Sequence, residues 1–275
     1  MGSILIDCDK TVRITAPALM AMLIPHGFAA AAEASEGCRP GPGRPVLVEA
    51  LVDRETLRLG DGRIIKLAGV IDYQAGSAGS LSRPQDNDKL PAAVLNRQAR
   101  LKLVERRADR YGRWRAHVFL QGEPQIWLQA RMVAKGLARV LAFRDNALCA
   151  QALLKLEHAA RRAHLGLWAK RRFAIRRARD LVRLKGDINT FQIVEGRIRQ
   201  VTRRRKRIYL NFGTDWRLDF TATITSGDKR YFTRAGLDLD ALQGQMVRIR
   251  GWVISQNGPM IGLAHPMQIE RVSPK

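Results

Sequence analysis

The stretch VEALVDRETLRLGDGRIIKLAGVIDYQ, residues 48–74, predicts a β-hairpin. Apolar residues occupy every second position on both sides of the Gly-Asp-Gly turn at residues 60–62. Period-two spacing around a turn of this kind is typical of two paired antiparallel strands. We therefore expect the fold to be organised around this hairpin.

Charged side chains stand at particular places on the predicted hairpin. Glu55 precedes its first strand, Lys66 lies inside its second strand, and Asp72 follows that strand. A cation in the middle of a strand and carboxylates at the strand ends would hold a phosphate and a metal ion. The same charges also fit a solvated surface with no ligand, and the stretch alone leaves both interpretations open.

The chain is long enough for one large domain or two smaller ones, and it is strongly basic. It has 275 residues, of which 46% are apolar, and its formal net charge is +23. A charge of this size favours a polyanionic partner, either nucleic acid or an anionic membrane surface.

The N-terminal residues predict a secretory signal. Lys10 and Arg13 precede an apolar run at residues 14–25 that is too short to span a bilayer, and small residues follow it. Acidic residues near the start leave open a later start codon or an ordinary N-terminal helix. We predict a signal peptide over residues 1–34, an exported protein (periplasmic or secreted), and no transmembrane span in the mature chain.

Three cysteines fit this prediction of export. Cys8 would leave with the signal peptide, so Cys38 and Cys149 would remain as an even pair. An oxidising compartment allows such a pair to form a disulfide, and we predict this bridge. No cysteine or histidine spacing is typical of a zinc site.

Residues 146–165 predict an amphipathic helix, and alternating strands are predicted before it at residues 99–106 and 114–120. The apolar positions at helical spacing, expected to face inward, are Leu148, Ala152, Leu156 and Ala159.

The composition changes after this helix. Residues 170–207 contain 15 Lys/Arg and three acidic residues, a net charge of +12, which is over half of the total. Short alternating runs separated by Gly, Asn and Asp turns follow, and they predict a small β domain. We predict a lead-in at 35–45, a first domain at 46–170, a basic linker at 171–189, and a β-barrel or sandwich, OB-like in one interpretation, at 190–275.

Two features of the predicted β domain point to nucleic acid. The first is the basic run at residues 203–207, which we expect to attract polyanions. Its residues are Arg203, Arg204, Arg205, Lys206 and Arg207. The second is a set of aromatic residues that would either stack on bases or fill the core. These residues are Trp216, Phe220, Tyr231 and Trp252.

Four features combine over residues 46–170: the hairpin, the turn DRYGR at 109–113, the segment WLQARMVAKGLARV at 127–140, and GLW at 166–168. Together they resemble the staphylococcal nuclease (thermonuclease) family. The resemblance implies an α+β or all-β fold, with a five-stranded OB-type barrel and packed helices. It also implies a Ca²⁺-dependent phosphodiesterase that acts on DNA and RNA.

The resemblance assigns roles to residues of this chain. Glu55 takes the position of a Ca²⁺ carboxylate, and Lys66 and Arg113 take the positions of the two catalytic arginines. Arg110 and Tyr111 match nucleotide contacts. Lysine keeps the charge of the first arginine but loses its bidentate fork.

The chain departs from the family at its carboxylates. Ile71 stands where a second Ca²⁺ aspartate is expected, although Asp72 would serve as a ligand after a shift of one residue. Gln74 stands where a catalytic glutamate is expected, and a neutral amide cannot accept a proton. Losing a general base costs on the order of 10²- to 10⁴-fold in rate.

We therefore expect a protein that binds nucleic acid and whose nuclease activity is weak or lost. One alternative is an active nuclease with a rebuilt Ca²⁺ site that uses Glu55 and Asp72. Another is a structural envelope protein that binds anionic lipid or a protein partner. Ca²⁺ is expected only for the active form, and no other cofactor is expected.

Overall fold

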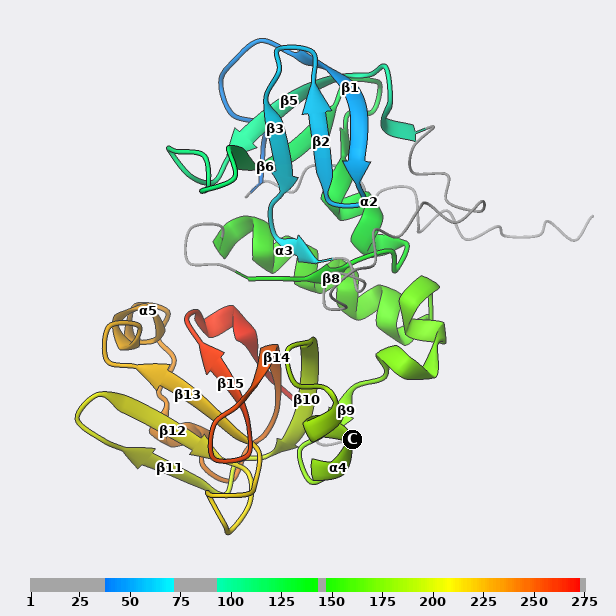
Figure 1. The fold of residues 1–275 in the computed structure, drawn as a ribbon. Helices are drawn as coiled ribbons and strands as arrows, with labels where there is room; N and C mark the ends of the chain where they lie inside the picture. The colour runs from blue at the N-terminus through cyan, green and yellow to red at the C-terminus, as the bar shows by residue number, and fades with distance from the viewer. Residues whose placement is uncertain (1–37, 72–92, 143–146, 273–275) are drawn as a thin grey trace, which may run out of the picture.

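The computed structural model describes residues 38–71, 93–142 and 147–272, which form two β-barrels that follow one another along the chain (Figure 1). The predicted signal peptide, Asp72 and Gln74 lie outside the described residues. No described helix is long and apolar enough to cross a membrane.

Five strands close the first barrel. They are β1 (Val46–Asp53), β2 (Thr56–Leu59), β3 (Ile64–Leu67), β5 (Gln98–Leu103) and β6 (Arg113–Leu120). Neighbouring strands follow the order β3-β2-β1-β5-β6, and a parallel pairing of β3 with β6 completes the ring. The third and fifth strands are thus parallel neighbours, which confirms the expected OB-type barrel. The predicted hairpin is β2–β3, in which Leu57 pairs with Ile65.

Short strands and helices pack below this barrel. They are β4 (Val70–Ile71), β7 (Ile126–Trp127), α2 (Leu128–Ala134), β8 (Arg139–Val140), α3 (Ala147–Arg162), η4 (Gly166–Ala169) and η5 (Arg171–Phe173). Apolar side chains of the barrel strands, of α2 and of α3 share one buried core. In Figure 1, α3 and β8 lie between the two barrels.

The predicted amphipathic helix is present as α3, but its buried face differs from the prediction by about one residue. Leu148, expected to face inward, is 63% exposed, whereas Cys149, Leu153 and Glu157 are buried. The difference arises because Glu157, a charged residue, belongs to the buried face. A hydrophobic pattern alone assigns such a residue to solvent.

A disulfide ties the segment before β1 to α3. The sulfur atoms of Cys38 and Cys149 are 2.01 Å apart, and the bridge joins residues 111 positions apart in the sequence. Both cysteines are buried in the first core.

The second barrel has the same ring order. Its strands are β10 (Phe191–Arg197), β11 (Gln200–Arg203), β12 (Arg207–Asn211), β13 (Thr221–Thr225), β14 (Met246–Ser255) and β15 (Pro259–Leu263). β10 and β11 are two halves of one bent strand, because Ile198 still bonds to the β14 side while Arg199 already bonds to β12. β13 and β15 are parallel neighbours, and α5 (Lys229–Arg234) connects β13 to β14. The second domain is therefore an OB-like barrel.

The segment predicted as a basic linker, residues 171–189, is part of the second barrel's structure. β9 (Arg176–Arg177) pairs in parallel with β10, and α4 (Leu181–Gly186) buries Leu184 in the second core. A few apolar residues among many charged ones are enough to anchor this segment. A short helix, η6 (Asp240–Leu242), lies between α5 and β14. After β15, η7 (Pro266–Gln268) leads to β16 (Ile269–Arg271), which pairs with β14.

Buried charges join the two barrels. Arg250 of β14 lies 2.7 Å from the Glu157 carboxylate of α3, with only 2% and 1% of the two side chains exposed. The other Glu157 oxygen accepts a hydrogen bond from the Val140 N–H. Arg139 of β8 donates to the backbone oxygens of Phe173 and Phe191 at 2.9 Å. A small apolar cluster built around Ala160, Trp168 and Ile193 completes this interface.

Candidate functional site

The first barrel carries a row of cations on its outer face. Lys66 of β3 lies opposite Arg115 of β6 in the parallel pairing, and Arg113 precedes Arg115 by two positions. Residues two apart on a strand point to the same side of a sheet. The structure thus brings together Lys66 and Arg113, the two predicted phosphate-binding residues.

Each cation of this row has its own carboxylate. Lys66 Nζ lies 2.5 Å from Glu55, Arg115 lies 2.9 Å from Glu105, and Arg113 lies 2.8 Å from Asp109. Hydrogen bonds from the Arg113 backbone and side chain lower the pKa of Asp109, which favours its charged form. The row is therefore neutralised locally.

The predicted nucleotide contacts lie on the turn beside this row. Asp109 shapes the turn by accepting hydrogen bonds from the backbone N–H groups of Tyr111 and Arg113. The Tyr111 ring is exposed, with the guanidinium groups of Arg110 and Arg113 at 4.8 and 5.0 Å from its centre. An exposed aromatic face flanked by cations is suited to contact a nucleotide.

The described residues do not fit the Ca²⁺ site that the resemblance implies. Ile71 is buried in β4, where it pairs with Arg139 of β8, and Glu55 is engaged by Lys66. Within the described ranges, the one close group of potential metal ligands is Cys38, His117 and Cys149. Its two sulfur atoms are bonded to each other, and it offers no hard oxygen ligand.

The predicted basic run forms a turn between β11 and β12. Arg203 at one end is 2.7 Å from Asp240, and this hydrogen bond raises the pKa of the Arg203 guanidinium. Arg207 at the other end donates to Gln256 at 3.3 Å. The residues between these anchors are exposed and have no side-chain partner in the described part of the chain: Arg204, Arg205 and Lys206.

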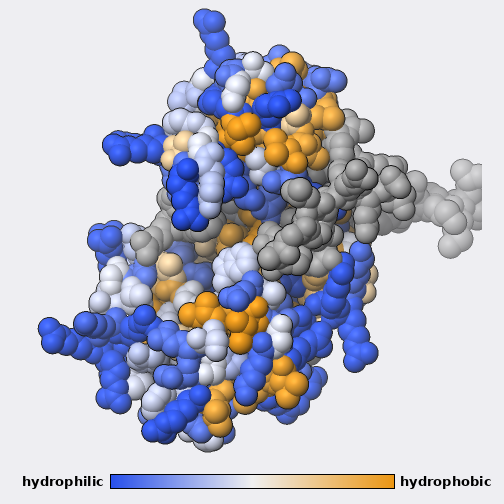
Figure 2. Space-filling view, viewed as in Figure 1, coloured by the Kyte–Doolittle hydropathy of each residue, from blue (hydrophilic) through white to orange (hydrophobic). Residues whose placement is uncertain are grey.

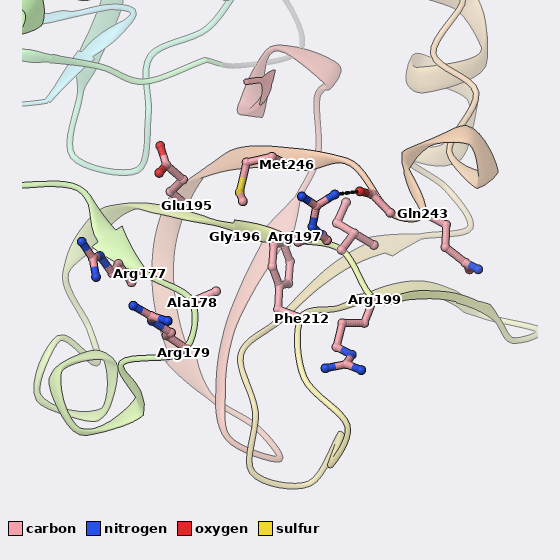
Figure 3. A pocket seen from close by; sticks show the side chains of 12 residues that line it. Arg177, Ala178, Arg179, Glu195, Gly196, Arg197, Arg199, Phe212, Gln243 and Met246 are labelled. Carbon is pink, nitrogen blue, oxygen red and sulfur yellow. Dashed lines mark hydrogen bonds between the residues drawn. The ribbon is translucent and has the colours of Figure 1, made fainter. Parts of the chain in front are cut away.

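Four further arginines surround an open basin of about 1000 Å³ on the second barrel. They are Arg177, Arg179, Arg197 and Arg199, which we call the arginine basin. In Figure 3, Arg177 and Arg179 lie on one side of the Phe212 ring, and Arg199 lies on the other. Among its described lining residues Glu195 alone is acidic, and Arg248, from outside the basin, already binds Glu195 at 2.7 Å.

No carboxylate of the described residues pairs with any of these four guanidinium groups. Arg197 donates to the Gly244 backbone oxygen at 2.5 Å, which fixes its direction without neutralising its charge. Hydrophilic side chains also cover much of the second barrel on the face shown in Figure 2. The basin therefore concentrates positive charge that no described carboxylate neutralises.

Sequence reasoning missed the arginine basin, although a signal exists. The pattern Arg-x-Arg occurs at 177–179 and again at 197–199. The middle residues, Ala178 and Ile198, are buried in the second core. Alternation then turns both flanking arginines of each pair outward.

Comparison with known proteins supports the interpretation of the first barrel. Residues 87–170 match a protein-family model described as staphylococcal nuclease homologue. The match includes β5, β6, α2 and α3, and the hairpin strands outside it complete the same ring. A search of curated proteins found no match. The first barrel is thus thermonuclease-like, being similar to staphylococcal nuclease homologues over residues 87–170, and a second OB-like barrel follows it.

Proposed function

We propose that this protein is an exported nucleic-acid-binding protein of the nuclease type, with hydrolytic activity that is weak or lost. The observation that carries the binding proposal is the arginine basin. Four guanidinium groups that no described carboxylate neutralises create a site that attracts polyanions, and arginine binds phosphate oxygens in bidentate geometry. The exposed turn at 204–206 and the flanked Tyr111 ring add further contacts.

The arrangement of the first barrel supports the loss of hydrolysis. Lys66 and Arg113 can orient a phosphate, but Glu55 is engaged by Lys66 and the buried Ile71 supplies no carboxylate. Hard oxygen ligands beside the scissile phosphate are what a Ca²⁺-dependent hydrolase requires. A chain with this arrangement would bind the phosphodiester and leave it intact.

The disulfide between Cys38 and Cys149 supports export. Disulfides form and persist in oxidising compartments, and they are rare where glutathione and thioredoxin keep thiols reduced. Alkylation of native protein isolated without reductant tests the bridge, and labelling of both thiols would contradict it.

The binding proposal is tested with the full chain and a labelled single-stranded oligodeoxynucleotide, followed by fluorescence anisotropy between 50 and 200 mM salt. Affinity should fall steeply with salt, with a slope of about −0.7 per phosphate contact. Reversing Arg177, Arg179 and Arg199 to Glu should reduce that slope by about two. A matched reversal outside the basin should change it less: Arg58, Arg230 and Arg234.

Affinity that stays constant across this salt range would contradict the proposal. Preferential binding to anionic vesicles over the oligonucleotide at equal salt would favour the envelope-protein alternative instead.

Hydrolysis is tested separately with single-stranded DNA and RNA in the presence of Ca²⁺. We expect no cleavage above that of an Arg113→Ala variant. Cleavage that requires Ca²⁺ and disappears in Arg113→Ala would favour an active nuclease with a rebuilt site.

A further inference from the structure

We propose that the outer face of the second barrel is a binding site for the bases of a single-stranded nucleic acid, an inference that rests on the proposed function. A cavity of about 400 Å³ lies on this face. Its lining includes Thr202, Arg204, Tyr209, Asn211, Trp216 and Thr221. We call it the outer-face groove. Its volume lies within the range of sites that hold a small ligand, such as one or two nucleotides.

The strands place the groove outside the barrel. In β12, Ile208 and Leu210 belong to the core, so Tyr209 and Asn211 point the other way. Tyr209 pairs with Thr202 on one neighbouring strand, and Asn211 pairs with Thr221 on the other. The groove therefore runs across β11, β12 and β13.

Two loops border the groove. Arg204 comes from the turn between β11 and β12, and Asn257 comes from the turn between β14 and β15. In the ring order of this barrel, these turns connect the first strand to the second and the fourth to the fifth. OB-type barrels bind oligonucleotides and oligosaccharides on the face of the second and third strands, between these two loops.

The chemistry of the lining favours a nucleic-acid strand. Trp216 is 51% exposed, and the Arg217 guanidinium lies 4.6 Å from its ring centre. An exposed indole offers a stacking face for any base, and the cation strengthens such a platform. Arg204 provides a charge for a phosphate. The described lining contains no acidic residue that would repel a phosphate.

A buried hydroxyl gives an independent indication of a ligand. Thr221 lines the groove and is only 2% exposed, and its Oγ1 has no hydrogen-bond partner among the described residues. Leaving a buried polar group unpaired is unfavourable, and such groups in native proteins are nearly always satisfied. Beside it, Asn211 Nδ2 donates to Thr202 Oγ1 at 3.2 Å, which orients the amide. The edge of a bound base would supply the missing partner of Thr221.

The test compares the wild-type full chain with two variants, using a labelled ten-residue oligodeoxythymidylate and fluorescence anisotropy. Trp216→Ala should weaken binding by about 5- to 150-fold, the range expected for losing one stacked base. The salt slope should remain unchanged, because no phosphate contact is removed. An exposed apolar residue far from the groove provides the control: Leu148→Ala should bind like the wild type.

Thr221→Val provides the second variant. It preserves the shape of the side chain and removes only the unpaired hydroxyl, so the fold should remain as stable or become more stable. Binding should nevertheless weaken several-fold, a combination that a purely structural role would not give.

The outcomes separate this inference from the proposed function. A wild-type chain that binds no oligonucleotide even at low salt overturns both. A wild-type chain that binds, with both groove variants binding equally well, overturns the groove and leaves the arginine basin as the binding surface. Tryptophan fluorescence that is quenched by a neutral oligosaccharide and not by the oligonucleotide, with the quenching absent in Trp216→Ala, would also overturn the nucleic-acid assignment.

Discussion

At the scale of single residues, one buried carboxylate contributes to the contact between the barrels. Glu157 accepts a hydrogen bond from the Val140 backbone at 2.7 Å and faces Arg250 at 2.7 Å. Both charged groups are buried, and the attraction between them offsets the free-energy cost of their desolvation. Removing Arg250 leaves Glu157 buried without its ion-pair partner, and removing Glu157 leaves Arg250 only the Glu270 carboxylate at 3.6 Å, so either loss is more costly than losing an exposed pair.

Glu157→Gln should therefore lower the free energy of unfolding by about 3–5 kcal/mol, as measured by urea denaturation. The same substitution in an exposed pair serves as the control. Glu49 and Arg58 are each 53% exposed, and Glu49→Gln should cost less than about 1 kcal/mol. Equal losses in the two variants would show that burial of the Glu157 pair does not determine its contribution.

His117 should make the fold sensitive to acid. Burial, together with the Lys102 charge, lowers its pKa from 6.5 to about 3, and neither ring nitrogen has a hydrogen-bond partner in the part of the chain that the structure describes. Between these two values the unfolded chain binds a proton that the native protein excludes. The contribution of His117 to stability is therefore complete above pH 6.5 and is lost as the pH falls toward 3.

This linkage amounts to about 1.4 kcal/mol per pH unit within that window. The measurement is the free energy of unfolding of the wild type and of His117→Leu between pH 4 and pH 7. As the pH falls, the free energy of unfolding of the wild type should decrease more steeply than that of His117→Leu, by about 1.4 kcal/mol per pH unit. Parallel pH profiles would contradict the assignment.

At the scale of elements, two glycines hold the end of α2 against the end of α3. Gly136 has a φ of 66°, and a Cβ built there would lie 2.2 Å from the Leu165 backbone oxygen. Gly166 has a φ of 53° and approaches the Gly136 oxygen in the same way. The Leu167 N–H donates a hydrogen bond to the Gly136 backbone oxygen at 2.8 Å. The repeated Gly-Leu pattern at 136 and 166 thus has a packing reason.

Gly136→Ala should lower the free energy of unfolding by about 3 kcal/mol or more, because the added carbon meets backbone that cannot easily move. Gly62→Ala separates the two causes, since Gly62 has a φ of 83° with nothing within 4 Å of its Cβ position. That control should cost only the conformational strain, about 1–2 kcal/mol. Denaturation of both variants would show whether the close approach adds to the strain.

Periodicity was sufficient to predict elements whose surroundings are uniform. The hairpin strand β3 alternates between buried and less buried positions, and the basic turn is visible as a run of like charges. Periodicity failed where polar residues are buried. Glu157 shifts the inner face of α3, and the segment around Leu184 joins the second core despite its charged neighbours.

The site was predictable in the same uneven way. Lys66 and Arg113 follow from the resemblance, whereas the arginine basin requires knowing that β9 lies beside β10. In a chain with 48 Lys/Arg, nothing local distinguishes the buried Arg250 from the exposed Arg199. That distinction depends on long-range pairing, which a sequence pattern does not contain.

At the scale of the whole molecule, the two barrels have separate hydrophobic cores, and a small apolar cluster lies between them. Ile193 of β10 belongs to the small cluster with Trp168, whereas its neighbour Val194 belongs to the second core. Adjacent residues of one strand thus pack on opposite sides, one in the contact between the barrels and one in the core of the second barrel. Together with the buried Glu157–Arg250 pair, this contact should couple the barrels so that neither unfolds alone.

We therefore expect one calorimetric transition for the wild type, with equal calorimetric and van't Hoff enthalpies. Combining Ile193→Ala with Glu157→Gln weakens the contact while leaving both cores filled, so two transitions should appear. Val194→Ala provides the matched control: it removes a core side chain from the same strand, and it should lower the melting temperature while keeping one transition. Two transitions in the wild type, or a split transition in Val194→Ala, would show that the contact between the barrels does not carry the coupling.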